Sequence, residues 1–232
     1  MKSEDGGPHT TNERETMSLI SVMQQIASGF GATLLIFFCT LLFSMPLGVL
    51  VALGRMSKFK PLSLLIQGII SVLRGTPLML QLIVVFYGPY YAFGIKLSTN
   101  WRLYATLIGF SINYAAYFAE IFRAGIQSIP VGQTEAATVL GYTKVQTFLK
   151  IIFPQMVKRT IPPVTNEVIT LVKDTSLAFV LAYQEMFTYA KQVSAAMSSL
   201  MPLFVAGVFY YIFNLVVTIV MDRIEKALSY YN

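Results

Sequence analysis

Several long runs of apolar residues constrain this chain more than any other feature of its sequence. Each run is about 20 residues long, the length of α-helix that crosses the hydrocarbon core of a bilayer. Hydrophobic residues make up 55% of the 232 residues and charged residues only 12%, whereas soluble domains carry roughly 25% charged residues. The short segments of alternating polarity that a transmembrane barrel requires do not occur. The pattern predicts an all-α integral membrane protein.

Five membrane-spanning helices fit the apolar runs. Pro46 predicts a kink inside the first, because proline removes one helical hydrogen bond, and residues 74–77 (RGTP) interrupt the second. Residues 1–16 are polar and are predicted to form a disordered tail ahead of a transmembrane domain of residues 17–232. The helices are expected at about residues 19–53, 62–93, 103–122, 164–183 and 202–220.

Lysine and arginine residues are distributed unevenly between the two sides of the predicted bundle. The connections after the first and third helices, together with the C-terminal end, hold ten basic residues, and the opposite side holds five. Because short cytoplasmic loops are enriched in Lys and Arg, the N-terminus is predicted outside and the C-terminus inside. Topology thereby explains the net charge of +6, and no nucleic-acid partner is expected.

The longest cytoplasmic connection, about residues 124–162, has the pattern of two short helices joined at Gly141. Glycine permits the positive backbone angle that commonly ends a helix. Residues 143–146 (TKVQ) have the T-x-x-Q form of a capping box, which starts a second helix, and Pro154 is expected to end or kink that helix. On these grounds alone, an amphipathic hairpin on the inner leaflet and a docking element for a cytoplasmic partner are about equally favoured.

Four segments of the chain carry a resemblance to a known family. The loop pattern resembles the EAA loop of permease subunits of binding-protein-dependent ABC importers, although Phe153 stands where the family usually has Leu; packing is expected to tolerate this change. Residues 74–77, 119–130 and 166–179 resemble the polar amino acid (histidine, arginine or glutamine type) branch of these permeases. The loop residues that carry the resemblance, and that it assigns to coupling with the ATPase, are Glu135, Ala136, Ala137, Gly141, Ile151 and Pro154.

The resemblance implies a permease that forms half of a translocation path in a prokaryotic cell membrane. It implies a dimer with a second, identical or related permease subunit, an ATP-binding subunit docked on the loop, and an extracellular substrate-binding protein. The sequence lacks the G-x-x-x-x-G-K-[ST] loop that cradles phosphates, so ATP and Mg²⁺ are expected on the partner subunit and no cofactor on this chain. Cys39 is the only cysteine, and neither catalytic residues nor a metal site are expected.

Polar residues inside the predicted helices are the candidates for the substrate path, because charged groups in the membrane usually pair or line a water-filled route. Glu167 and Asp174 share one helix face, which fits either a cavity for an ammonium or cationic group or a buried structural network. Glu120 is expected to pair with Arg123, three residues away. The excess of acid favours a cationic amino acid, although another polar one remains open. The candidates are Thr76, Gln81, Asn113, Glu120, Asn166, Glu167, Lys173, Asp174, Thr175 and Ser176.

Two other functions fit parts of the pattern. A passive channel for a polar solute would use the same polar helix faces but would leave the cytoplasmic loop without a role. An intramembrane hydrolase would use Glu167 and Asp174 as paired carboxylates, and a metal-dependent one would need ligands that the predicted helices lack. A channel conducts without ATP, and a hydrolase turns over substrate without a partner subunit.

Overall fold

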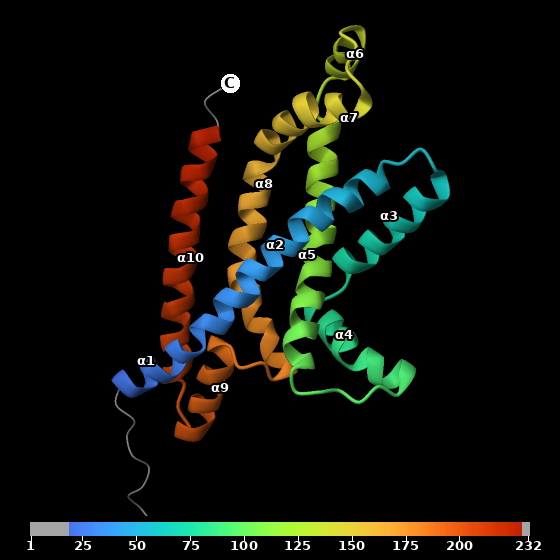
Figure 1. The fold of residues 1–232 in the computed structure, drawn as a ribbon. Helices are drawn as coiled ribbons and strands as arrows, with labels where there is room; N and C mark the ends of the chain where they lie inside the picture. Colours follow the sequence, from blue (N-terminus) through green and yellow to red (C-terminus); the bar gives the residue numbers. More distant parts are fainter. Residues whose placement is uncertain (1–18, 229–232) are drawn as a thin grey trace, which may run out of the picture.

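The computed structural model describes residues 19–228, and every regular element in that part of the chain is helical (Figure 1). The predicted disordered tail, residues 1–16, lies outside the described residues. A π-helical turn (η1) and a 3₁₀ segment (η2) interrupt the series of α-helices. The elements are α1 (Leu19–Ser28), α2 (Phe30–Arg55), α3 (Lys60–Gly75), α4 (Leu78–Phe93), α5 (Trp101–Gln127), α6 (Val131–Val139), α7 (Lys144–Thr147), η1 (Phe148–Ile152), α8 (Phe153–Asp174), η2 (Thr175–Leu181), α9 (Met186–Met197) and α10 (Met201–Leu228).

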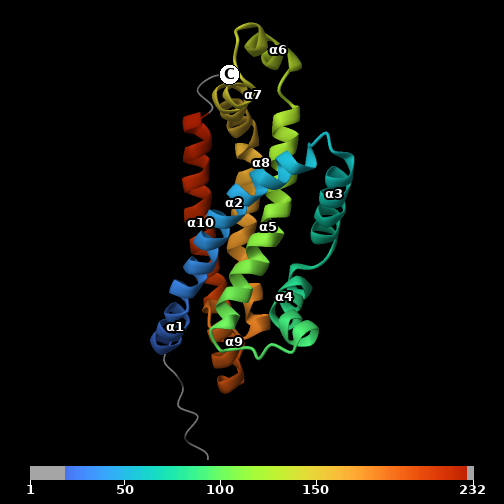
Figure 2. The same ribbon diagram turned by 45° about the vertical axis from the view of Figure 1, so that its right-hand side comes forward.

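The helices pack around α5 and α8, which are in contact at the middle of the molecule. α2 crosses α5, α10 lies along α8, and the pair α3–α4 lies on the side of α5 away from α10 (Figure 1, Figure 2). α6 and α7 lie at one end of the molecule, here called the loop end, where α10 also finishes. α4 and α9 lie at the other end, here called the far end, where α1 begins.

One face of α5 supplies the centre of the core. Phe110, Tyr114 and Phe118 follow one another at intervals of four residues, which places them on the same side of a helix, and each is at most 1% exposed. They belong to one cluster with the buried Ile36 of α2 and Leu171 of α8. The core therefore lies where α5 faces α2 and α8, and the remaining helices cover it from the sides.

Length and composition mark only some of the helices as membrane spans. Within the described residues, the stretch 19–55 and α10 are long and apolar enough to cross a bilayer. The pair α3–α4 becomes a third span if its two helices, bent by 112° at their break, count as one. α5 and α8, which carry most of the polar candidates, do not meet the same criterion. The five-span topology therefore stays a prediction.

Two helix breaks shape the first half of the chain. The predicted interruption at residues 74–77 lies between α3, which ends at Gly75, and α4, which begins at Leu78. The first helix, expected at about residues 19–53, runs from Leu19 to Arg55 with a one-residue break at Gly29 that separates α1 from α2. A Cβ atom at Gly29 would lie 2.6 Å from the backbone nitrogen of Met186, so glycine is required there for the close approach of a distant segment.

The chain continues as a helix beyond the predicted end of the coupling loop. Pro154 was expected to end or kink the second loop helix, but it lies in the first turn of α8, which begins at Phe153, eleven residues before the predicted start at about residue 164. Ile152 and Phe153 both have helical backbone angles, so the helical path does not stop at Pro154. The π-helical turn η1 joins α7 to α8 without a break in the helical path. At its other end, α8 stops at Asp174, and η2 continues as a tighter helix to Leu181.

An additional helix, α9, closes the far end of the molecule. Glu185 precedes it, is fully buried, and accepts hydrogen bonds from the backbone nitrogens of Phe187 and Thr188, both at 2.7 Å. The same carboxylate also accepts from the Thr188 Oγ1 at 2.8 Å and from the Tyr210 hydroxyl of α10 at 2.9 Å. Glu185 therefore caps α9 and joins it to α10.

Candidate functional site

A carboxylate pair lies along the contact between α5 and α8. The Tyr114 hydroxyl of α5 donates a hydrogen bond of 2.8 Å to Oδ2 of Asp174. Glu167 lies two helical turns away on the same face of α8, because residues seven apart on a helix project in nearly the same direction. Both carboxylates are half-buried, whereas Lys173 is exposed. Asp174 is therefore held at the α5 interface, and Lys173 lies on another face.

The break between α3 and α4 is tied to α5 by a second polar group. The Gln81 side-chain nitrogen donates to the Leu73 carbonyl at 2.7 Å and to the Thr76 hydroxyl at 2.8 Å. The Asn113 side-chain nitrogen donates to Gln81 Oε1 at 3.0 Å and to the Leu73 carbonyl at 3.3 Å. These bonds satisfy the Leu73 carbonyl, which loses its helical hydrogen bond at the break. Gln81 and Asn113 therefore hold the bend at a defined place on α5. Their side chains form interhelical hydrogen bonds and do not line an open binding pocket.

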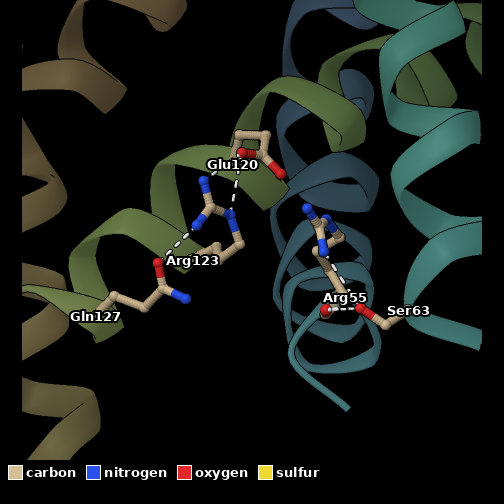
Figure 3. Close-up of polar contacts among 5 residues, drawn as sticks. All are labelled: Arg55, Ser63, Glu120, Arg123 and Gln127. Atoms are coloured by element: carbon tan, nitrogen blue, oxygen red, sulfur yellow. Dashed lines mark hydrogen bonds and ion pairs between the residues drawn. The ribbon is translucent and has the colours of Figure 1, made fainter. Parts of the chain in front are cut away.

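The ion pair expected near the loop end of α5 forms. Arg123 donates to Glu120 Oε2 through Nε at 3.0 Å and through Nη2 at 2.7 Å, and its Nη1 donates to the Gln127 side chain at 2.6 Å (Figure 3). On the neighbouring helices, Arg55 of α2 donates to the hydroxyl of Ser63 of α3 at 3.2 Å. Arg123 thus bonds to Glu120 and Gln127 on its own helix, and Arg55 bonds to Ser63 on the next helix.

A pocket of about 430 Å³ opens beside this ion pair, between α3, α5 and α8. Arg74 contributes to its wall from the end of α3, with its guanidinium carbon 5.1 Å from the centre of the Tyr117 ring. Arg159 of α8 contributes from the loop end and donates a hydrogen bond to the Ser128 carbonyl. The pocket therefore lies between the end of α3 and the loop end of α8, and its lining includes neither Glu167 nor Asp174.

The remaining path candidates do not gather at one position. Asn166 is exposed, and its carbonyl accepts a bond from Thr170 within the same helix. Thr175 is fully buried and donates to the Val172 carbonyl. Ser176 donates to the Lys173 carbonyl at 2.7 Å. The hydroxyl donors of these last two residues are engaged by the backbone of the preceding turn, so they support the junction of α8 and η2.

The loop has the local geometry that its sequence predicts. Gly141 has φ +78°, and Thr143 and Gln146 form the expected capping box with reciprocal bonds of 2.9 and 3.3 Å. Apolar side chains on this loop are strongly exposed, with Val139 at 88% and Leu140 at 73%. Val145 and Leu149 are exposed as well. Together these four residues, here called the apolar knob, form a surface with no cover in the described part of the chain.

The coupling residues divide into exposed and supporting positions. Glu135, Ala136, Gly141 and Pro154 are exposed, and Ile151 is half-buried. Ala137 is 1% exposed, because it packs inside the loop. A charge at Ala137 would therefore disrupt the loop itself, and the surface that a partner could contact is formed by its neighbours.

Four residues at these sites were absent from the predicted set. Tyr114 contacts Asp174 of the carboxylate pair, and Arg159 lines the loop-end pocket. Arg74 was named only as part of the break at residues 74–77, and Glu185 had no predicted role. Glutamate is not one of the residues favoured at helix N-caps, so the sequence carried no clear signal for the capping role of Glu185. Nothing in the linear sequence places Tyr114 opposite Asp174, since 60 residues separate them.

Comparison with known proteins gives consistent matches over most of the chain. Residues 44–230 match the family described as binding-protein-dependent transport system inner membrane component. The chain is 35% identical to the L-cystine transport system permease protein TcyB of Bacillus subtilis (strain 168), over 89% of this chain and 87% of that protein. It is also 35% identical to the arginine transport system permease protein ArtQ of the same organism, over 88% of this chain and 92% of that protein.

Solved structures match most of the chain. The structure of an amino acid ABC transporter with histidines superposes with a TM-score of 0.80 at 29% identity, over 90% of this chain and 97% of the matched chain. A chain of the inward-facing MetNI methionine ABC transporter superposes with a TM-score of 0.73 at 20% identity, over 89% of this chain and 97% of that chain. The second likeness concerns the fold alone.

Proposed function

Because the chain belongs to the family of binding-protein-dependent transport system inner membrane components, we propose that it is the permease subunit of an ATP-driven bacterial importer of amino acids. The relatives named for cystine and arginine transport cover nearly the full length of this chain. The apolar knob is the structural observation that carries the proposal, because a passive channel or a self-contained enzyme gives such a surface no function. Exposed apolar patches of this kind mark sites of association with proteins or membranes, and the match to the transport family favours a protein partner over the inner leaflet.

The loop end is proposed to face the cytoplasm, where an ATP-binding subunit contacts the apolar knob and binds ATP and Mg²⁺. The excess of basic residues at this end supports the orientation. The beginning of α1 and the end of α10 lie at opposite ends of the molecule (Figure 1), as an odd number of membrane crossings requires. Five spans satisfy this condition. An extracellular substrate-binding protein would then deliver the amino acid at the far end.

A second permease subunit is proposed to complete the translocation path. α3 buries only Ile70, and its exposed apolar residues Leu64, Leu65 and Val72 line a hollow of about 500 Å³. The loop-end pocket opens between α3, α5 and α8, so an identical or related subunit beside α3 would close the route that one subunit leaves open. Rocking of the two halves would alternate access between the two sides of the membrane.

The substrate is proposed to be a cationic amino acid, with Asp174 and Glu167 receiving its positive groups. The Tyr114 hydroxyl fixes Asp174 at one point, and the second carboxylate oxygen is left to accept another donor. A guanidinium or ammonium group forms strong, charge-assisted bonds with carboxylates at such a position. Lys173 is exposed on another face of α8, and its positive charge acts on the neighbouring Asp174 without forming an ion pair among the described residues.

The first experiment is uptake of a panel of labelled amino acids into proteoliposomes that contain the permease and its ATP-binding subunit. Saturable accumulation that requires ATP and the binding protein is expected, with arginine, lysine or histidine preferred. Amino acid flux that does not depend on ATP would establish a channel instead. Chemical conversion of a substrate by the permease alone would establish the hydrolase that uses Glu167 and Asp174.

Two substitutions separate substrate recognition from coupling. Asp174→Asn is expected to raise the external KM for a cationic substrate about tenfold, because a charge-assisted bond is replaced by a neutral one; Asp222→Asn, at an exposed position of α10, is the control. Leu140→Asp is expected to abolish stimulation of the partner ATPase, because the charge would be desolvated in the interface. Leu140→Met keeps the apolar surface and is expected to retain coupling. Normal uptake by Leu140→Asp would contradict the docking role of the apolar knob.

A further inference from the structure

The pocket at the loop end has a strongly cationic wall. Its lining includes three arginines, Arg74, Arg123 and Arg159, and a single carboxylate, Glu120. Its volume of about 430 Å³ is within the range of small-molecule sites. The charge of this pocket is opposite to that of the acidic pair formed by Glu167 and Asp174.

The three guanidinium groups differ in how well they are neutralised. Arg123 is paired with Glu120 at 2.7 Å. Arg159 donates to the neutral carbonyl of Ser128 and has no carboxylate partner among residues 19–228. Arg74 packs against the face of the Tyr117 ring and makes no hydrogen bond or ion pair within the same part of the chain, although its charge acts on Glu120 and Glu167 from a distance. Two guanidinium groups therefore offer unused donors to the pocket, and such groups match carboxylates in a bidentate geometry.

The pocket and the acidic pair lie on one continuous strip. Along α8, Asp174, Glu167, Pro163 and Arg159 follow at spacings of seven, four and four residues, which keeps them on one face of a helix. Pro163 and Arg159 both line the pocket. Tyr117, beneath Arg74, lies one turn along α5 from the Tyr114 that bonds Asp174. A solute moving along this strip therefore meets acid first and arginine afterwards.

We propose that the loop-end pocket is a release site that holds the carboxylate of the amino acid as it leaves the acidic pair. The inference rests on the proposed function, since it concerns the exit of the same substrate. The acidic pair attracts the positive groups of an amino acid and repels its carboxylate. Arg74 and Arg159 supply the complementary charge between that pair and the loop end. The same site can then be refilled from the cytoplasm, so accumulated amino acid slows its own import through its carboxylate.

The test measures inhibition from the inside of proteoliposomes that contain the permease, its ATP-binding subunit and its binding protein. The vesicle interior is loaded with increasing amounts of the unlabelled transported amino acid or of the amine that results from its decarboxylation. Initial ATP-dependent uptake of labelled amino acid is then followed. The internal amino acid is expected to inhibit at roughly tenfold lower concentration than the amine, because only the amino acid carries the group that the arginines bind.

Substitution of the arginines locates the effect. Arg159→Gln and Arg74→Gln are each expected to raise the internal concentration for half-inhibition about tenfold, and Arg159→Lys is expected to retain part of the effect. Arg159→Gln is also expected to leave the external KM unchanged, whereas the charge of Arg74 acts on Glu167. Arg223→Gln removes an exposed charge at the loop end of α10 and is expected to behave as the unchanged protein. Internal inhibition that is the same in both Gln variants as in the unchanged protein would overturn the proposal, and so would a rise in external KM alone.

A lipid headgroup is the competing occupant of the same pocket. The assay is therefore repeated in vesicles of purely zwitterionic lipid, where no anionic headgroup can bind the arginines. Loss of the difference between Arg159→Gln and the unchanged protein in these vesicles would assign the pocket to a lipid headgroup and reject the release site. A complete lack of ATP-dependent amino acid uptake by the unchanged protein would instead reject the proposed function, and the release site with it.

Discussion

Glu185 provides a quantitative test of how the far end of the molecule is held together. Its buried carboxylate caps α9 through two backbone nitrogens and accepts two hydroxyl bonds, from Thr188 and Tyr210. Glu185→Ala removes the cap, worth about 1 kcal/mol. It also leaves two largely buried hydroxyls without their acceptor, at about 1 kcal/mol each. The expected loss of stability is therefore about 3 kcal/mol.

Thermal unfolding in detergent measures this loss. For a domain of this size, each kcal/mol lowers Tm by about 2–4 °C, so Glu185→Ala is expected to lower Tm by about 6–12 °C. Tyr210→Phe removes one hydroxyl bond to the same carboxylate and is expected to lower Tm by about 2–4 °C. Asp222→Ala, at an exposed position on α10, serves as the control and is expected to leave Tm nearly unchanged.

A double-mutant cycle isolates the bond that the two side chains share. Because Glu185 and Tyr210 contact each other, the Tm losses of the two single variants should not add in Glu185→Ala/Tyr210→Phe. A decrease below about 2 °C for Glu185→Ala would refute the reasoning, since it would mean that the carboxylate does not hold α9 against α10. Additive losses in the double variant would show that the two side chains act independently.

Three further changes test other parts of the fold. Gly125→Ala would place a Cβ in collision with the Thr160 Cγ2 and is expected to lower stability by about 1–3 kcal/mol, measured by thermal unfolding. Asn113→Leu is expected to lower the stability by about 1–3 kcal/mol because it leaves the Gln81 side-chain oxygen without its hydrogen-bond donor. A Tm within about 1 °C of the unchanged protein would contradict this. Gly141→Ala strains the backbone at φ +78° and is expected to lower the ATPase activity that the permease stimulates in its partner. Gly132→Ala is the control: residue 132 lies in α6 with open space around it, so this activity is expected to be preserved.

Local chemistry made several features predictable from sequence. The capping box of residues 143–146 and the positive φ at Gly141 depend on a few neighbouring residues, so their pattern alone was sufficient. The Glu120–Arg123 ion pair was predictable for the same reason, because residues three apart on a helix are neighbours. The break at residues 74–77 follows from a proline, which excludes the preceding residue from the helical region.

Other features depended on segments far apart in the chain. The need for glycine at residue 29 comes from the approach of Met186, and no pattern near Gly29 reports that contact. The sequence around Pro154 is the same whether the proline ends one helix or begins the next. In the structure a π-helical turn precedes it and the helix continues. The sequence also could not distinguish an exposed Val139 from a buried Ala137, because both lie on one short helix and only its packing separates them.

Composition and the spacing of apolar residues by themselves determined that this protein is a helical membrane protein, since long apolar runs are stable only in a bilayer or a large core. The order of its motifs determined the family. Only the tertiary structure decided which polar residues meet: it placed Tyr114 on Asp174, Gln81 on Asn113, and Arg74 beside the loop-end pocket. The physical reason is that a hydrogen bond requires atoms about 3 Å apart, and the packing angles of whole helices, rather than the residues around each donor, bring such atoms together.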